Sequence, residues 1–179
     1  KSPFDGVEEA LRLMRDKADV VILTASNGKE IRKEWEDSGL MEYADLLLSQ
    51  ESGTKEMCLR SLTEHGYEKD HVLMIGDAPA DKMAAESAEA LFYPVLAYQE
   101  TESWEEFAEE GLKRFLEGTF AGTYQEEKIK ELFLSGEIDF NDEVMITNVR
   151  HKTAMSEALK SLSLVKQSIE DQMPEDFYS

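Results

Sequence analysis

The sequence predicts an α/β protein in which parallel strands alternate with single helices, followed by a helical segment. Three observations support this fold class. Short apolar runs recur at regular intervals through residues 20–95. Amphipathic stretches with helical spacing lie before and between these runs. The runs are apolar throughout, which is typical of strands that helices cover on both faces of a parallel sheet.

Helices and strands are expected to alternate four times in the first half of the chain. Each predicted strand is a run of four to six residues. The first, Val20-Val21-Ile22-Leu23, shows the pattern plainly, because it is apolar and mostly β-branched and ends at Thr24. The pattern predicts helices over 7–17, 29–37, 55–64 and 80–87, and strands over 20–23, 44–49, 71–75 and 90–95.

Beyond Pro94 the pattern is helical. Apolar residues recur at helical spacing from Trp104 to Leu116 above a Glu-rich face, which predicts a surface helix. A polar stretch over 118–124 leads to a second helical segment over 126–133. A 3-4-3-4 spacing then predicts a helix that packs lengthwise on another helix, through Met155, Ala158, Leu162, Val165 and Ile169. We therefore expect an α/β core over 1–125, a helix and linker over 126–142, and a helical segment over 143–179.

Composition narrows the classes of function. Nineteen Lys and Arg against 39 Asp and Glu leave a formal charge of −20, which argues against binding to nucleic acid or to anionic lipid surfaces. No apolar run approaches the roughly 18 residues of a membrane span. The single cysteine, Cys58, can form no internal disulfide, and we expect it to be a buried, inert thiol in a cytoplasmic protein.

A polar segment, Thr24-Ala25-Ser26-Asn27, directly follows the first predicted strand. Ligands of parallel α/β sheets gather outside the carboxyl ends of the strands. A hydroxyl group and free backbone N–H groups at the start of a helix can hold a phosphate oxygen there. Ser, Thr and Asn are also ordinary helix caps, so this segment alone leaves both interpretations open.

A lysine opens the helix after the second predicted strand, in Gly53-Thr54-Lys55. Its ammonium group could neutralise a phosphoryl group during transfer. A lone lysine is usually only a solvated side chain, so this motif points to function only in company with others.

Two carboxylates follow the third predicted strand, in Gly76-Asp77-Ala78-Pro79-Ala80-Asp81. Carboxylates in a tight turn repel each other unless a cation lies between or beside them, and hard oxygen ligands suit Mg²⁺. The alternative is a turn with a helix cap, in which Asp81 favours the positive end of the helix dipole. We favour the metal interpretation.

Together these segments resemble the second, third and fourth motifs of the haloacid dehalogenase (HAD) superfamily. The motifs are a hydroxyl residue after a strand, a helix-opening lysine, and Gly-Asp-x-x-x-Asp. The resemblance covers about residues 1–130 and implies a Rossmann-like parallel sheet and a Mg²⁺-dependent phosphatase with a small phosphorylated substrate. Shorter matches to one subgroup of these hydrolases are Glu34-Trp35, Ser49-Gln50-Glu51, Phe92-Tyr93-Pro94, Ser103-Trp104 and Gly122-Thr123-Tyr124-Gln125.

The resemblance also implies a role for each matching residue. Thr24 would donate a hydrogen bond to the phosphoryl group, within the substrate-binding segment Thr24-Ala25-Ser26-Asn27. Lys55 would stabilise the charge that develops on that group. Asp77 would ligate Mg²⁺, and Asp81 would support the metal or Lys55.

The family's first motif, an Asp-x-Asp at the end of the first strand, is absent from this sequence. In that family it supplies the nucleophile and the general acid, so we expect this chain alone not to hydrolyse phosphate esters. Asp5-Gly6 does not replace it, because that pair follows Pro3 and not an apolar strand. The family's first strand lies between those that end here at Thr24 and Gly76, so we expect an incomplete sheet.

Three sources could fill the place of that strand: an upstream segment, a partner chain, or the internal run 143–149. We favour the upstream segment. The chain has no initiator Met and no targeting pattern, so we expect that it begins partway through a larger protein. Residues 148–151 look more like the entry to a helix than the end of a strand.

From about residue 127 the sequence is similar to the tRNA-modifying GTPase family MnmE (TrmE), where the GTPase domain ends and the helical domain resumes. No Gly-x-x-x-x-Gly-Lys-Ser/Thr loop is present, so no GTP site is implied. Joined or chimeric reading frames would explain both resemblances, whereas an accidental match would leave 126–179 as a helical appendage. The matching residues are Lys128-Ile129-Lys130-Glu131-Leu132-Phe133, Gly136-Glu137-Ile138 and Ile146-Thr147-Asn148-Val149-Arg150-His151.

Two hypotheses of function follow. The first is a HAD-type phosphatase core that becomes active when a segment with the missing aspartates completes it. The second is a noncatalytic fragment whose C-terminal helix assembles with MnmE-like helices or with a second copy of the chain. The substrate is not predicted, because no cap segment is recognisable between Thr24 and Asp77.

Overall fold

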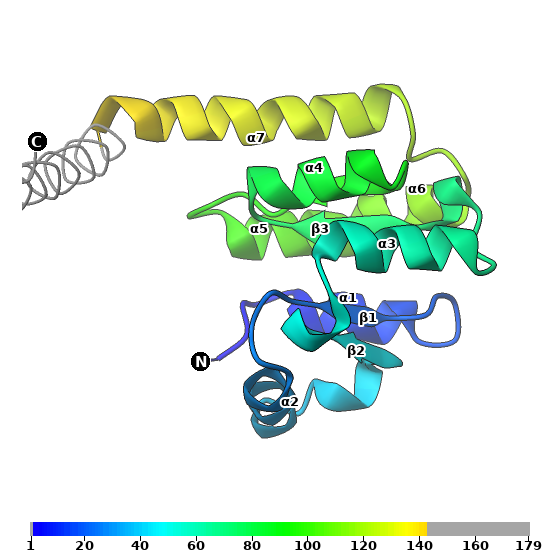
Figure 1. Ribbon diagram of the computed structural model, residues 1–179. Coiled ribbons are helices and arrows are strands. Elements are labelled where there is room, and N and C mark those ends of the chain that lie inside the picture. Colours follow the sequence, from blue (N-terminus) through cyan, green and yellow to red (C-terminus); the bar gives the residue numbers. More distant parts are fainter. Residues whose placement is uncertain (1, 143–179) are drawn as a thin grey trace, which may run out of the picture. The chain divides into compact units, whose positions relative to one another are not determined.

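A computed structural model describes residues 2–142 (Figure 1). The predictions for 143–179 lie outside the described residues. These are the 3-4-3-4 helix, the internal run 143–149 and the Ile146-Thr147-Asn148-Val149-Arg150-His151 part of the MnmE-like match. Residues 1–135 form one compact unit, and no helix within the described residues is long and apolar enough to cross a membrane.

The predicted alternation of helices and strands is confirmed. α1 (Val7–Met14) precedes β1 (Val21–Leu23), and each later strand also follows a helix. The strands have only three or four residues, fewer than predicted. The remaining pairs are α2 (Gly28–Asp37) with β2 (Leu46–Leu48), α3 (Lys55–Glu64) with β3 (Leu73–Gly76), and α4 (Pro79–Ser87) with β4 (Leu91–Pro94).

The region after β4 is helical, as predicted, but its bounds differ. α5 (Glu100–Glu106) runs through a π-helical turn (Phe107–Gly111) into α6 (Leu112–Leu116), so the expected surface helix is locally widened. α7 (Thr123–Asp142) begins before residue 126 and continues beyond 133. It begins directly after Gly122, whose φ of 83° lies in the left-handed region that glycine readily adopts.

The four strands form two separate two-stranded sheets. β1 pairs in parallel with β2, placing Val21 opposite Leu46, and β3 pairs in parallel with β4, placing Leu73 opposite Leu91. Within the described residues no strand joins β1 to β3. The prediction of a parallel α/β sheet that is incomplete because a central strand is absent is therefore confirmed for the described residues.

Burial of the strands follows from this division. All four residues of β4 are buried, although β4 lies at an edge, whereas β1 and β3 each contain only one buried residue. The expectation of apolar strands covered on both faces therefore holds for β4 only. β2 contains no buried residue, and β1 and β3 each lack a strand partner on one side within residues 2–142, so these three strands stay partly exposed.

The outer edge of β4 is closed by a side chain. Gln125, in the first turn of α7, accepts a hydrogen bond from the Phe92 N–H through Oε1, at 2.9 Å. An unpaired strand edge is a template for pairing with other chains, and proteins commonly cover such edges. The start of α7 thus supplies a hydrogen bond that a further strand would otherwise supply.

An aromatic cluster forms the centre of the core. The ring centroids of Tyr93 and Phe107 lie 5.0 Å apart, and those of Phe120 and Tyr124 lie 5.2 Å apart. The Tyr93 hydroxyl donates to the Ser103 carbonyl oxygen at 2.8 Å, and burial raises the pKa of this tyrosine. A second cluster joins α3 and α4 to β3 and β4, through Leu59, Val72, Met74, Ala84, Ala85, Ala88 and Phe92.

We predict that Phe120→Ala lowers the free energy of unfolding by about 3–5 kcal/mol, because the ring is fully buried and its loss leaves a cavity. Urea denaturation followed by circular dichroism measures the change. Met83→Ala is the matched control, since Met83 is 65% exposed, and it should stay within about 0.5 kcal/mol of the parent protein. Equal losses in the two variants would contradict this account of the core.

Candidate functional site

The three polar segments singled out in the sequence all follow the carboxyl end of a strand. Thr24 comes directly after β1, Lys55 opens α3 after the loop that follows β2, and Asp77 comes directly after β3. This is the edge at which parallel α/β sheets bind ligands. The arrangement arises because each strand turns into a helix within a few residues.

The Thr24 hydroxyl is free to donate a hydrogen bond. Its Oγ1 accepts from the Ser26 N–H at 3.1 Å, which leaves the hydroxyl proton available. The Thr24 N–H donates to the Leu48 carbonyl oxygen at 3.0 Å and so continues the pairing of β1 with β2. Thr24 is partly buried, whereas Ala25 and Ser26 are exposed to solvent.

Asn27 is the N-cap of α2. Its Oδ1 accepts from the Lys29 N–H at 3.0 Å and from the Glu30 N–H at 3.4 Å. Of the two interpretations left open for this segment, helix capping is therefore the one that applies to the Asn27 side-chain oxygen. A contact between Asn27 and a substrate stays a prediction.

Lys55 and Asp81 form an ion pair. Lys55 Nζ lies 2.5 Å from Asp81 Oδ1, and the Asp81 side chain is almost completely buried. Thr54 caps α3 by accepting from the Met57 N–H at 3.2 Å. This cap fixes the start of the helix and so the position of Lys55, its first residue. Of the two roles predicted for Asp81, support of Lys55 is the one that these contacts favour.

Gly76 makes room for the Asp81 carboxylate. A Cβ atom added to Gly76 would lie 2.5 Å from Asp81 Oδ2 and 2.7 Å from Asp81 Cβ, closer than real contacts allow. The second carboxylate oxygen, Oδ2, accepts from the Ala78 N–H at 3.4 Å. The glycine of the motif is thus required by the close approach of the buried aspartate.

Of the two aspartates predicted to bind Mg²⁺, Asp77 and Asp81, only Asp77 has its carboxylate available to a cation. Asp77 is exposed at the end of β3, and carboxylate oxygens are typical Mg²⁺ ligands. Both oxygens of Asp81 already have polar partners. Within residues 2–142, three metal-ligating side chains converge only at Glu68, Asp70 and His71, which precede β3. Asp77 could therefore hold Mg²⁺ only together with further ligands.

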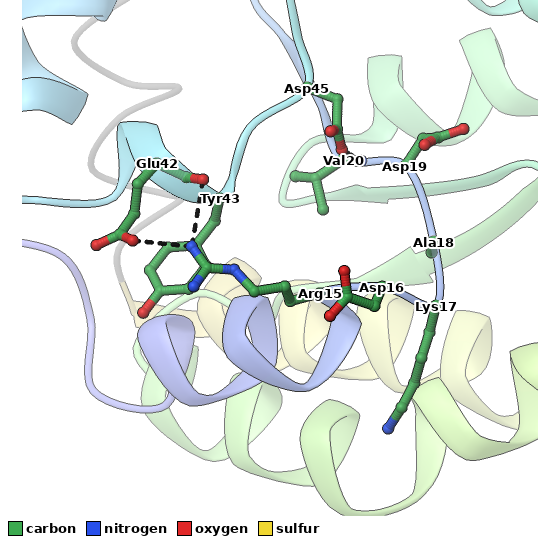
Figure 2. Close-up of a pocket in the computed structure, with 9 residues that line it drawn as sticks. All are labelled: Arg15, Asp16, Lys17, Ala18, Asp19, Val20, Glu42, Tyr43 and Asp45. Atoms are coloured by element: carbon green, nitrogen blue, oxygen red, sulfur yellow. Dashed lines mark hydrogen bonds and ion pairs between the residues drawn. The ribbon is translucent and has the colours of Figure 1, made fainter.

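A polar cleft of about 560 Å³ lies at the other end of β1 (Figure 2). Arg15 lies against its wall, where the guanidinium binds Glu42 at 2.8 Å and lies 4.7 Å from the centroid of the Tyr43 ring. The Val20 N–H donates to Asp45 at 2.8 Å. Val20 precedes β1 and Thr24 follows it, so this cleft is not the candidate site.

Sequence reasoning gave no role to two residues of the loop after β2. Ser49 is buried, its hydroxyl donates to Glu51, and Glu51 in turn accepts from the Asn27 side chain at 3.4 Å. The only signal was the short subgroup match that contains these residues. They bring the loop after β2 into contact with the start of α2.

Comparisons with known proteins agree with both resemblances. The family model described as haloacid dehalogenase-like hydrolase matches residues 1–95, which include Thr24, Lys55, Asp77 and Asp81. No solved structure matches the chain.

A different set of curated proteins matches about a third of the chain. The tRNA modification GTPase MnmE of Lachnoclostridium phytofermentans is 57% identical over 54 residues, which are 30% of this chain and 12% of that protein. The MnmE of Acetivibrio thermocellus is 41% identical over 54 residues, with the same two shares. This chain therefore spans only about an eighth of the length of these relatives.

We predict that Asp81→Asn lowers the free energy of unfolding by about 1–3 kcal/mol, because the Lys55 ammonium group loses its charged partner. Asp77→Asn is the matched control on the same turn, and its exposed side chain should contribute no more than about 0.5 kcal/mol. Thermal and urea unfolding measure both. If Asp77→Asn were as destabilising as Asp81→Asn, the ion pair would not be the stabilising element.

Proposed function

This chain belongs to the haloacid dehalogenase-like hydrolases, and on that premise we propose that its α/β core is part of a Mg²⁺-dependent phosphoester hydrolase that lacks the nucleophile. One observation carries the proposal. The Lys55–Asp81 pair lies at the carboxyl ends of the strands, where Thr24 and Asp77 also lie. A hydroxyl donor, a cation and a carboxylate are the groups that phosphoryl transfer requires.

Each residue has a part in the proposed reaction. The Thr24 hydroxyl donates to a phosphoryl oxygen, since its own oxygen already accepts from Ser26. The Lys55 ammonium group neutralises the charge that develops on the phosphoryl group, and Asp81 holds it in place. Asp77 would bind Mg²⁺, which when bound supplies positive charge to the phosphoryl oxygens.

The proposal also explains why a further segment is needed. No predicted strand of this sequence ends in Asp-x-Asp, so no aspartate takes the place of the nucleophile. The facing edges of β1 and β3 have no strand partner within the described part of the chain. One apolar strand that ends in Asp-x-Asp would pair with both edges and bring a carboxylate to the candidate site. An upstream segment or a partner chain is the proposed source.

We predict that the chain alone releases no phosphate from a panel of small phosphate esters. Adding a peptide with an apolar strand that ends in Asp-x-Asp should restore release in the presence of Mg²⁺ and not in EDTA. Lys55→Ala should lower the restored rate at least about 100-fold, because one preorganised charge is lost. Malachite green detection of phosphate measures each rate.

Two controls distinguish an effect on the candidate site from a general effect on folding or on peptide binding. Lys113→Ala removes an exposed lysine of α6 and should leave the restored rate unchanged. A peptide with Asn-x-Asn in place of Asp-x-Asp should bind without restoring activity. Robust hydrolysis by the chain alone would contradict the proposal that the nucleophile is missing.

A second candidate function is assembly with MnmE-like helices. The 57% identity over 54 residues to an MnmE protein favours it, because that similarity is far higher than chance and is to a protein of a different family. The apolar 3-4-3-4 spacing from Met155 to Ile169 is typical of helices that pack lengthwise. The partner would be such a helix in another protein or in a second copy of this chain.

We predict, for this second candidate, a dimer whose amount rises with protein concentration in light scattering. Deleting residues 143–179 should abolish it, because the apolar spacing lies in that segment. tRNA binding is tested in parallel by filter retention, and the chain's charge of −20 predicts that none occurs. A dimer that survives the deletion would contradict the assignment to this segment.

A further inference from the structure

The carboxylate of Glu51 connects two loops at the carboxyl ends of β1 and β2. One oxygen, Oε1, accepts from Asn27 Nδ2 at 3.4 Å, and the other, Oε2, accepts from the Ser49 hydroxyl. The Gly28 backbone lies close enough to this carboxylate to help lower its pKa. Glu51 thus receives hydrogen bonds from the start of α2 and from its own loop.

The two loops lie so close together that a larger residue at Gly28 would have to displace the Ser49 hydroxyl. A Cβ atom added there would lie 2.8 Å from Ser49 Oγ and 3.4 Å from Glu51 Oε2. The Gln50 N–H donates to the Ser26 carbonyl oxygen at 3.2 Å, which adds a backbone bond between the loops. The contact is therefore a built junction of backbone and side chains.

The same loop continues to Lys55. The Ser52 N–H donates to the Ser49 carbonyl oxygen at 2.8 Å, and the Ser52 hydroxyl oxygen accepts from the Ser49 N–H at 3.3 Å. Cys58 Sγ lies 3.7 Å from the Ser52 carbonyl oxygen, which ties the loop to α3. Lys55 is the first residue of that helix.

We propose that Glu51 is a positioning residue of the candidate site, which holds the loop of Thr24 and Ser26 in register with the loop that leads to Lys55. A phosphoryl group that Thr24 and Lys55 contact together requires that these two groups keep a fixed separation. No strand between the two sheets provides this within the described residues, so the junction at Glu51 does so from the side of β2. The inference rests on the proposed function for what the two loops hold.

The charge state of Glu51 suits this task. The Ser49 hydroxyl donates to the carboxylate and, together with nearby backbone groups, lowers its pKa, although desolvation opposes the shift. The carboxylate is therefore ionised at neutral pH and receives all of its hydrogen bonds. A glutamine would keep the size of the side chain and lose the charge.

Hydrogen exchange by NMR tests the proposal on the full chain without substrate. In Glu51→Gln, exchange should become about tenfold faster or more at the Gly28 amide beside the carboxylate and at the Gln50 amide, whose bond to the Ser26 carbonyl oxygen joins the two loops. The Lys55 ammonium protons should also exchange faster, because the loop no longer holds that helix start. The Val95 amide, bonded to the Gly76 carbonyl oxygen at 2.9 Å, should keep its rate.

Two other patterns would overturn the proposal. Faster exchange at Gly28 alone would make Glu51 a local cap of α2, and equally faster exchange at Val95 would make it a general support of the fold. Glu36→Gln, an exposed carboxylate in the last turn of α2, is the matched control and should change none of these rates.

A second variant decides the case if Glu51→Gln does not fold. Asn27→Ser keeps an N-cap for α2 and removes the amide that donates to Glu51, so the Gln50 amide and Lys55 ammonium rates should rise in it too. Unchanged rates there would overturn the proposal. Hydrogen exchange needs no turnover, so unchanged exchange rates would overturn the role of Glu51 and leave the proposed hydrolase function untouched. A failure of the Asp-x-Asp peptide to restore phosphate release would, in turn, leave the exchange test unaffected.

Discussion

The ion pair between Lys55 and Asp81 is the interaction on which the rest of the site depends. Lys55 belongs to the helix after β2 and Asp81 to the helix after β3, so the pair connects elements of two sheets that share no strand pairing in the described residues. A buried carboxylate without a cation is costly, so Asp81 keeps the ammonium group in place. Apolar packing also connects the two sheets, because Val20, beside β1, and Ile75, in β3, pack against the same core cluster.

The order of helices and strands could be predicted from the sequence, because apolar runs and amphipathic spacing are local properties. The absence of a central strand could be predicted as well. The order of the motifs matches a family whose first motif, at the end of that strand, is not found in this sequence. Exact bounds could not be predicted. The π-helical turn over Phe107–Gly111 and the early start of α7 depend on tertiary packing and on the backbone conformation of Gly122.

For the candidate site, the sequence predicted which residues lie at the edge of the sheet. It did not predict which of them form hydrogen bonds and ion pairs with one another. Residues that follow parallel strands must meet at one edge, so the neighbourhood of Thr24, Lys55 and Asp77 follows from the pattern alone. The choice of Asp81 between a metal and Lys55 depends on a distance that no spacing rule supplies. Glu51 was overlooked because its hydrogen-bond partners are Asn27, far away in the sequence, and a buried serine.

The hydrogen bond from the Phe92 N–H to Gln125 bears on how the chain divides into parts. The family model ends at residue 95, yet the sheet edge is completed by a residue thirty positions later. The aromatic cluster also takes Phe107, Phe120 and Tyr124 from beyond that point. The residues that the family model covers are therefore fewer than those that complete the fold, and an excised domain would have to extend past Gln125 to keep both sets of contacts.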